Sequence, residues 1–212
     1  MQVIVPLKSS DIKSFEAQYK KTLGKAHVIE VWLDQIKDLD TFLEDFEDFR
    51  KDKSEFFLGV CKSVEEGGQF KGTSLEKSQI LDHFLKFGGD GVDFDIARNP
   101  LKIMAPFPHE RLWLSFHDYQ GVPEDLETIM LGMYVLEPSI YKFSVTVDTQ
   151  EALDLFLEFV NDFPPHIHGI FTTMGKLGKV GRQSIGDKSW GAFYALDEKN
   201  KTAEGQPTLA DL

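Results

Sequence analysis

Cysteine is nearly absent from this sequence. Cys61 is the single cysteine, so no disulfide can form within the chain. A thiol nucleophile needs a base nearby, and no base adjoins Cys61 in the sequence. We therefore expect Cys61 to fill space as a small apolar residue. A chain without disulfides is typical of reducing compartments, and we expect a cytoplasmic location.

Long apolar runs are also missing. No apolar stretch approaches the roughly 20 residues that a membrane-spanning helix needs. The N-terminus, MQVIVPLKSS, lacks the basic start and the long apolar stretch of a signal peptide. We therefore expect no membrane partner.

Positive charge is scarce relative to negative charge. The chain has 23 Lys and Arg against 35 Asp and Glu, a formal net charge of −12. Nucleic-acid binding requires clustered cations, and an acidic surface disfavours adhesion to anionic lipid, so neither is an expected partner. A small anionic substrate remains compatible with this charge, because a few local cations reverse the field inside a pocket.

Short runs of β-branched and aromatic residues recur along the whole chain and predict eight strands. They span residues 2–7, 28–33, 55–61, 91–96, 111–117, 141–147, 168–174 and 190–196. Segments with apolar residues at spacings of three and four predict helices between several of them. These helices cover residues 11–24, 39–52, 74–89 and 149–163. We expect Asp11 to cap the first helix and Gly24 to end it.

Alternating strands and helices predict parallel pairing with right-handed crossovers. Eight such units in 212 residues fit a compact α/β fold, the (β/α)8 TIM barrel, as a single domain over residues 1–212. An open doubly wound sheet is the alternative. It is disfavoured because the segment after the first strand, VPLKSSDI, lacks the glycines of a dinucleotide-binding turn.

The segment after the eighth strand is short. DEKNKTAEGQPTLADL leaves room for a loop and about one turn of helix. We therefore expect the final helix of the barrel to be short or missing, with apolar surface left uncovered near the chain ends. A second subunit would cover that surface; a truncated chain is the other explanation.

Charged residues lie on the strand faces that point into the predicted barrel. In residues 141–147 the apolar side chains suit the layer that packs on helices, which sends Lys142 inward. The same alternation on three other strands sends further polar residues and Trp32 inward. These are Glu30, Trp32, Asp93, Asp95, Ser115 and His117.

Two interpretations of this interior are open. Buried charge must be paired, so Lys142 would form a stabilising ion pair with Asp93 or Asp95. Alternatively, burial lowers the pKa of a lysine, and a neutral amine forms a Schiff base with a carbonyl. His117 on the neighbouring strand would then move the adjacent proton. A β-elimination from a hydroxyketone needs these two groups and neither metal nor cofactor.

Seven segments carry a resemblance to a known family, in its order. They are IEVWLD, CKSVEEGG, GVDFDI, LSFHDY, IYKFSVTV, TMGKLGKVGR and TAEGQ. The chain resembles type I 3-dehydroquinate dehydratase, the Schiff-base lyase of the shikimate pathway that leads to aromatic amino acids. The resemblance implies a small-molecule substrate, 3-dehydroquinate or a related hydroxyketone carboxylate, and a homodimer.

The resemblance also implies roles for individual residues. Lys142 would form the imine, His117 would transfer the protons, and Glu66 would orient and polarise His117. Substrate-binding roles fall on six further residues. Arg182 and Gln206 would bind the carboxylate, Glu30, Lys62 and Trp32 would line the region of the ring hydroxyls, and Thr202 in the last loop would be a further substrate-binding residue.

The chain departs from the family pattern at several of these positions. Trp32 and Lys62 stand where the family has arginines that hold the ring hydroxyls, and Thr202 stands in place of a serine. Gly181 replaces the serine before the arginine, and Glu204 replaces a proline. A lysine keeps the charge but loses the planar fork of arginine. We therefore expect reduced turnover of dehydroquinate or a different preferred hydroxyketone.

Two functions other than dehydration of dehydroquinate are compatible with these residues. Barrel aldolases also form an imine on a late strand, so a retro-aldol reaction is an alternative. A degenerate barrel that binds a metabolite or partner without turnover is the second.

Three remaining patterns have simpler interpretations than a site. The HIH run, residues 166–168, is expected to be an exposed turn rather than a metal site. The acidic run over 44–53 is expected to be the solvated face of a helix. The glycine-rich segment over 172–182 lacks the ending of a phosphate-binding loop and is interpreted as a mobile lid.

Overall fold

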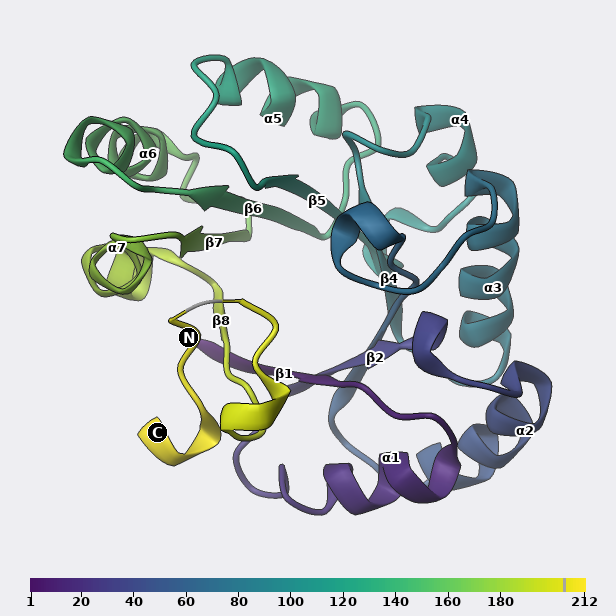
Figure 1. Cartoon of the computed structure of the whole chain (residues 1–212). Helices are drawn as coiled ribbons and strands as arrows, with labels where there is room; N and C mark the ends of the chain where they lie inside the picture. Colours follow the sequence, from purple (N-terminus) through teal and green to yellow (C-terminus); the bar gives the residue numbers. More distant parts are fainter. Residues whose placement is uncertain (204) are drawn as a thin grey trace. The chain divides into compact units, whose positions relative to one another are not determined.

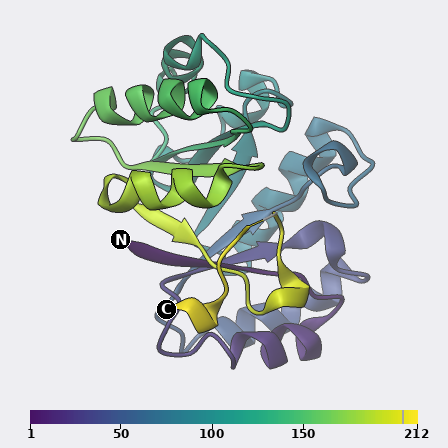
Figure 2. The same cartoon turned by 60° about the vertical axis from the view of Figure 1, so that its left-hand side comes forward.

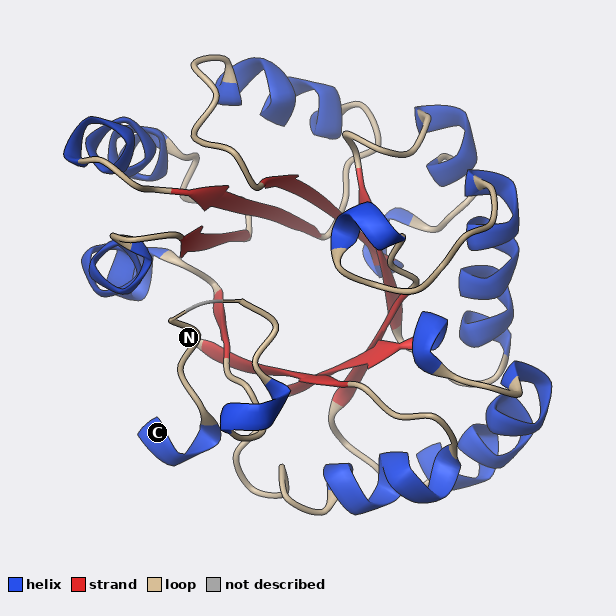
Figure 3. Ribbon diagram, viewed as in Figure 1, coloured by secondary structure: helices blue, strands red, loops and turns tan. Residues whose placement is uncertain are grey.

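The computed structural model describes residues 1–203 and 205–212. Strands alternate with helices along the chain (Figures 1 and 3). The strands are β1 (Gln2–Leu7), β2 (Val28–Trp32), β3 (Phe56–Val60), β4 (Gly91–Asp95), β5 (Leu112–Asp118), β6 (Ile140–Thr146), β7 (Gly169–Met174) and β8 (Gly191–Phe193). They form one sheet in the order β7-β6-β5-β4-β3-β2-β1-β8, and the registered neighbours pair in parallel. The predicted (β/α)8 barrel fold is confirmed.

Seven α-helices connect these strands within the described residues. They are α1 (Ile12–Tyr19), α2 (Leu39–Arg50), α3 (Ser74–Lys86), α4 (Leu101–Met104), α5 (Leu126–Tyr134), α6 (Gln150–Asp162) and α7 (Gly178–Ile185). Six 3₁₀ turns complete the described secondary structure. They are η1 (Leu33–Gln35), η2 (Val64–Glu66), η3 (His109–Arg111), η4 (Gly186–Lys188), η5 (Glu198–Asn200) and η6 (Leu209–Asp211).

The chain forms two compact units. The unit that holds Lys142, called the Lys142 unit below, consists of Met1–Gln2, Phe94–Phe193 and Ala203–Gln206. The other, called the Glu66 unit, consists of Val3–Asp93, Tyr194–Thr202 and Pro207–Leu212. Each is described by itself, and the expectation of a single domain stays a prediction.

Aromatic side chains build the core of the Glu66 unit. Phe46 of α2 lies with its ring centroid 5.4 Å from that of Phe57 on β3 and 5.2 Å from that of Phe84 on α3. All three are fully buried. A Cβ at Gly59 would lie 2.5 Å from the Phe84 ring, so glycine on β3 allows α3 to pack closely. The acidic residues of α2 are exposed while its phenylalanines pack inward, as predicted.

The first helix begins as predicted but ends earlier. Asp11 is its N-cap and accepts a hydrogen bond from the Ser14 backbone N–H at 2.8 Å. The helix ends at Tyr19 rather than at Gly24, because the following residues form turns with i→i+3 hydrogen bonds. Gly24 lies in one of these turns with φ +73°.

Alternation along β6 sorts apolar from polar residues in the Lys142 unit. Phe143 is fully buried, with its ring centroid 4.8 Å from that of Phe159 on α6 and 6.3 Å from that of Phe171 on β7. Helices α6 and α7 lie side by side in this unit (Figure 2). The odd-numbered face of β6 therefore packs on helices, as predicted, and Lys142 belongs to the opposite face.

Three helices were not predicted. Helix α4 spans only four residues, and α5 is apolar around much of its circumference, so neither has a clear helical pattern. Residues 172–182, interpreted as a mobile lid, lie mostly in regular secondary structure, and their role as a lid stays a prediction. Residues up to Met174 belong to β7, and α7 begins at Gly178, because the glycines there adopt helical backbone.

The chain leaves the sheet soon after β8. Strand β8 covers three residues instead of the predicted 190–196, because Ala195 bonds to the C-terminal segment: its N–H donates to Pro207 O and its carbonyl accepts from Leu209 N. Among the described residues after β8, only η5 and η6 are helical, so the prediction of a short or missing final helix is confirmed. None of the described helices is both long and apolar enough to span a bilayer.

Candidate active site

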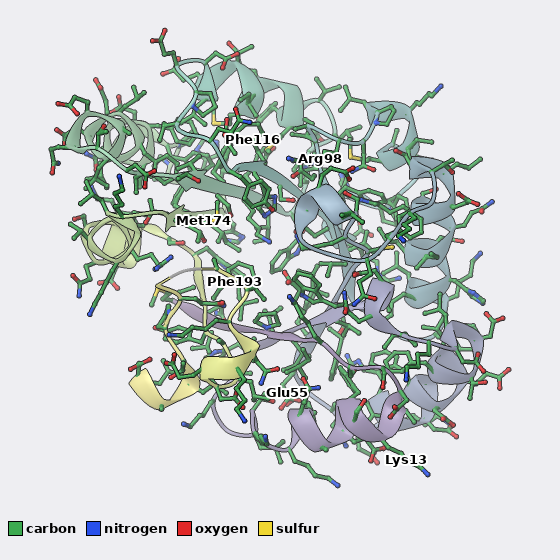
Figure 4. All side chains as sticks on the ribbon, viewed as in Figure 1. Lys13, Glu55, Arg98, Phe116, Met174 and Phe193 are labelled. Atoms are coloured by element: carbon green, nitrogen blue, oxygen red, sulfur yellow. The ribbon has the colours of Figure 1, made fainter. Side chains whose placement is uncertain are left out.

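Lys142 is a buried lysine in the middle of β6. It pairs in register with Ser115 on β5 and with Ile170 on β7. Only 4% of the residue is exposed, and Nζ lies 4.4 Å from the centroid of the Phe193 ring, which comes from β8 (Figure 4). Desolvation disfavours the ammonium form of a lysine, while an aromatic face favours it weakly. This setting suits an amine that must lose its proton to react.

His117 shares the strand face of Lys142. It pairs in register with Ser144, which is two residues beyond Lys142 on β6. Residues two apart on a strand point to the same face, so both side chains lie on one face of neighbouring strands. His117 is 9% exposed. The predicted pairing of these two residues on one face is therefore present.

Asp95 on β4 positions the His117 ring. Its Oδ2 lies 2.9 Å from His117 Nδ1 and also accepts a hydrogen bond from Arg98 Nη1 at 2.8 Å. The Ala97 backbone N–H donates to Oδ1 at 2.9 Å, and the Asp95 side chain has no exposed surface. An ionised Asp95 favours a proton on Nδ1, which makes Nε2 the nitrogen suited to proton transfer.

From the sequence we predicted that Asp95 lies inside the barrel, but only as a possible ion-pair partner of Lys142. Arg98 was not predicted to have a role. The arginine three residues after an inward-facing aspartate was the available signal. Arg98 also lies over the Tyr119 ring, with Cζ 5.7 Å from the centroid.

Arg182 lies against the loop that carries Gln206. Its Nη1 donates to the Thr173 carbonyl, and a Cβ at Gly205 would lie 2.7 Å from its Nη2. Gly205 has φ +68°, and Gln206 is 4% exposed. Burial lowers the pKa of Arg182, but a guanidinium remains charged at neutral pH. The structure thus brings together the two segments predicted to bind a carboxylate.

Gly181 has a packing explanation. A Cβ there would lie 2.5 Å from Thr173 Oγ1, and that hydroxyl donates a hydrogen bond to the Gly178 carbonyl at 2.7 Å. Thr173 is fully buried. The hydroxyl of Thr173 therefore occupies the space that a serine at position 181 would need. Glu204, the other departure in this group, lies outside the described residues.

Glu66, in the other unit, is held by two donors. Its Oε2 accepts from the Ser63 backbone N–H at 2.8 Å and from Lys77 Nζ at 2.7 Å. Glu66 is 6% exposed and Lys77 5%. Burial acts to raise the pKa of Glu66, but the ion pair with Lys77 and the Ser63 hydrogen bond outweigh it, and the pKa lies below its ordinary value. Sequence reasoning missed Lys77, because a lysine on an amphipathic helix normally faces solvent.

Glu30 and Trp32 form a second group in the Glu66 unit. Trp32 Nε1 donates to Glu30 Oε1 at 2.8 Å, which explains how an indole is accommodated beside a buried carboxylate. Lys62 Nζ lies 5.6 Å from the Trp32 ring centroid and Lys8 Nζ lies 3.8 Å from it. Lys8, directly after β1, was not predicted. Thr202 is exposed.

Cys61 and the histidines of residues 166–168 show no sign of a role as nucleophile or metal ligands. Cys61 is 2% exposed, and burial raises the pKa of its thiol to about 12, so it is not a thiolate at neutral pH. His166 and His168 are exposed, as predicted. Within the described residues, no group of three or more His, Cys, Asp or Glu side chains is arranged to hold a metal ion.

Lys142 and His117 are buried on the same face of the neighbouring strands β6 and β5. Together with the fold, they place the chain in the class of (β/α)8 enzymes that carry an inward-facing lysine. The family model for type I 3-dehydroquinase matches residues 3–212. The chain belongs to the type I 3-dehydroquinase family.

Relatives with known names agree with this assignment. The 3-dehydroquinate dehydratase of Streptococcus thermophilus is 28% identical over 223 residues, covering 100% of this chain and 96% of that protein. The Lactococcus lactis subsp. cremoris enzyme of the same name is 26% identical over 216 residues, covering 99% and 93%.

Solved structures share the fold at lower identity. Type I 3-dehydroquinate dehydratase from Clostridium difficile, solved with covalently modified comenic acid, matches with a TM-score of 0.84 at 19% identity and covers 99% of this chain and 89% of that one. The Geobacillus kaustophilus 3-dehydroquinate dehydratase has a TM-score of 0.83 at 20% identity, covering 99% and 87%.

Proposed function

We propose that this protein is a hydro-lyase that removes water from 3-dehydroquinate to give 3-dehydroshikimate through an imine on Lys142. One observation carries the proposal: a lysine that is 4% exposed lies on the same strand face as a histidine whose Nδ1 is held by a buried aspartate. A desolvated amine and an oriented imidazole are the two groups that imine-based elimination needs.

The reaction balances with these two groups. The neutral amine of Lys142 adds to the substrate ketone, and uptake of one proton with loss of one water gives the iminium. The iminium acidifies the neighbouring C–H, and His117 Nε2 takes that proton. The β-hydroxyl then leaves as water with a proton from the same imidazolium, forming the double bond. Finally, one water hydrolyses the iminium, which releases the product and the proton taken up at the start and regenerates the neutral amine, so the net change is loss of one water.

The other roles follow the family pattern. Glu66 would orient and polarise His117, and its ion pair with Lys77 keeps the carboxylate charged for that task. Arg182 and Gln206 would bind the substrate carboxylate, with the guanidinium making two parallel hydrogen bonds.

We assign Glu30, Lys62 and Trp32 to the ring hydroxyls, and Thr202 of the last loop to substrate binding. An indole offers one donor, and in this chain Trp32 gives that donor to Glu30. Weaker binding of the hydroxyls is therefore expected, and losing one charged hydrogen bond costs about 1.5–3 kcal/mol. The same observation favours a second candidate substrate, a related hydroxyketone carboxylate.

The enzyme would act in the cytoplasm as a homodimer in the shikimate pathway. It would need no metal or other cofactor, and neither nucleic acid nor a membrane is proposed as a partner.

Two measurements test the proposal on the wild type. Addition of dehydroquinate should produce a steady rise in the absorbance of the conjugated enone, and borohydride should trap a ligand adduct on Lys142. Lys142→Ala should abolish both, whereas Lys179→Ala, an exposed lysine in the same unit, should change neither. Trapping without enone would indicate another hydroxyketone or an aldolase, and the absence of both would indicate a binding protein.

A further inference from the structure

Three consecutive strands of the Glu66 unit end in a cluster of two lysines and one tryptophan. Trp32 is the last residue of β2, Lys8 directly follows β1, and Lys62 lies two residues beyond β3. Register pairs Leu7 with Val31 and Trp32 with Val60, so all three residues lie at the carboxyl ends of neighbouring parallel strands. In this fold, that end carries the substrate-binding groups.

Both ammonium groups contact the same indole. Lys8 Nζ lies 3.8 Å from the Trp32 ring centroid and Lys62 Nζ lies 5.6 Å from it. Trp32 is 4% exposed and its Nε1 is bonded to Glu30, so the ring has a fixed orientation. The indole therefore acts as a rigid support that holds two cations in one place.

Neither ammonium group forms a direct hydrogen bond or ion pair in the part of the chain that the structure describes, although the carboxylates of Glu30 and Asp34 act on Lys8, and that of Glu66 on Lys62, at longer range. Lys62 is only 7% exposed. Asp34 is engaged by backbone donors instead, accepting from the N–H groups of Lys62 and Gln69. A buried cation such as Lys62 is costly without a direct acceptor, and Lys8 beside it is half-buried, so acceptors from a ligand would relieve that cost.

The lowered pKa of Lys8 agrees with an ammonium group that lacks a direct acceptor. Burial lowers the pKa of Lys8, the carboxylates of Glu30 and Asp34 act to raise it, and the charge of Lys62 lowers it further. The net shift is downward, so the folded protein holds this ammonium at some expense of stability.

We propose that Lys8 is a substrate-binding residue that, together with Lys62, donates hydrogen bonds to the oxygen substituents of the substrate ring. The proposal rests on the proposed function and deepens it: the cation absent at position 32 is supplied from β1. Two separate ammonium groups would bind neighbouring hydroxyl oxygens as point donors, without the planar fork of a guanidinium.

Direct binding tests the inference independently of turnover. Calorimetric titration of 3-dehydroquinate into Lys8→Met should give a dissociation constant at least about 10-fold weaker than into wild type, as expected for one lost charged hydrogen bond. Lys8→Arg should restore binding to within about threefold, because it keeps the charge and reach. Lys13→Met, an exposed lysine on α1 (Figure 4), should bind like wild type.

The unfolding midpoint of Lys8→Met in urea separates binding from a structural role. It should be unchanged or higher, because removing a desolvated charge relieves the folded state. A lower midpoint with unchanged binding would overturn the inference and make Lys8 a structural residue. In a Lys8→Met background, Trp32→Arg should regain at least part of the lost affinity.

The outcomes also separate this inference from the proposed function. Binding without enone formation or imine trapping in wild type would reject the dehydratase, and the effect of Lys8→Met on binding would still decide the inference. Turnover by wild type with equal affinity in Lys8→Met would reject only the inference. Failure of wild type to bind dehydroquinate would overturn both.

Discussion

Asp95 Oδ2 lies 2.9 Å from His117 Nδ1 and shares that oxygen with the Arg98 guanidinium at 2.8 Å. The aspartate side chain is fully buried, so its charge is stabilised by these two partners and by the Ala97 backbone N–H. The carboxylate therefore fixes both the orientation and the tautomer of the imidazole.

Replacing Asp95 should impair proton transfer more than imine formation. Asp95→Asn keeps the size of the side chain but removes the charge that favours a proton on Nδ1. We expect kcat to fall by about 10²-fold or more, within the range that a positioned acid–base group contributes, while borohydride still traps ligand on Lys142. Steady-state kinetics and mass spectrometry measure the two effects.

Asp125→Asn is the matched control for this change. Asp125 is exposed and precedes α5 without a side-chain capping bond. It should leave kcat within about twofold of wild type. If Asp95→Asn behaves in the same way, the aspartate does not position the catalytic histidine.

The buried ion pair between Lys77 and Glu66 should be important for stability. The two side chains are 6% and 4% exposed, so removing the lysine alone leaves a buried carboxylate without its cation. Lys77→Met should lower the free energy of unfolding by about 3–5 kcal/mol, measured in urea. The double variant Glu66→Gln, Lys77→Met should recover part of that loss. Equal stability of Lys77→Met and wild type would contradict the pairing.

Glu66 also predicts a pH dependence of stability. Its pKa is raised by burial but lowered more by Lys77 and Ser63, so the folded value lies below that of the unfolded chain, about 4.3. The folded state then favours the carboxylate. Its contribution is fully present above pH about 4.3 and is lost as the pH falls through the folded pKa. The stability difference between wild type and Glu66→Gln should therefore shrink below about pH 4; a constant difference down to pH 3 would reject this linkage.

Patterning predicted the sheet well, because side chains on buried strands alternate with a period of two. That period placed Lys142 and Phe143 on opposite faces, and the packing of Phe143 on Phe159 confirms it. Helices with weak amphipathic patterns, such as α5, were not predicted, since their apolar residues do not fall on one stripe.

Side-chain partners were harder to predict than strand faces. Lys77 pairs with a residue 11 positions away and Lys8 packs on Trp32, 24 positions away, so both contacts depend on how separate elements meet. Local propensity holds no information on such contacts. The pairing of His117 with Asp95 could have been predicted, because strand alternation placed both residues inside the barrel. The same alternation also placed Asp93 there, so it did not show which aspartate pairs with His117.

Gly205 should be required because it adjoins Arg182. A Cβ at this position would lie 2.7 Å from Arg182 Nη2, and φ is +68°. Gly205→Ala should displace the guanidinium and raise KM for dehydroquinate by about 10-fold, as expected for a weakened charged hydrogen bond. Gly24→Ala is the matched control, since Gly24 has φ +73° but no atom within 4 Å of the added Cβ. Both variants should lose about 1 kcal/mol of stability from backbone strain, and only Gly205→Ala should change KM. An equal KM in both would mean that Arg182 tolerates the methyl group or does not contact the substrate.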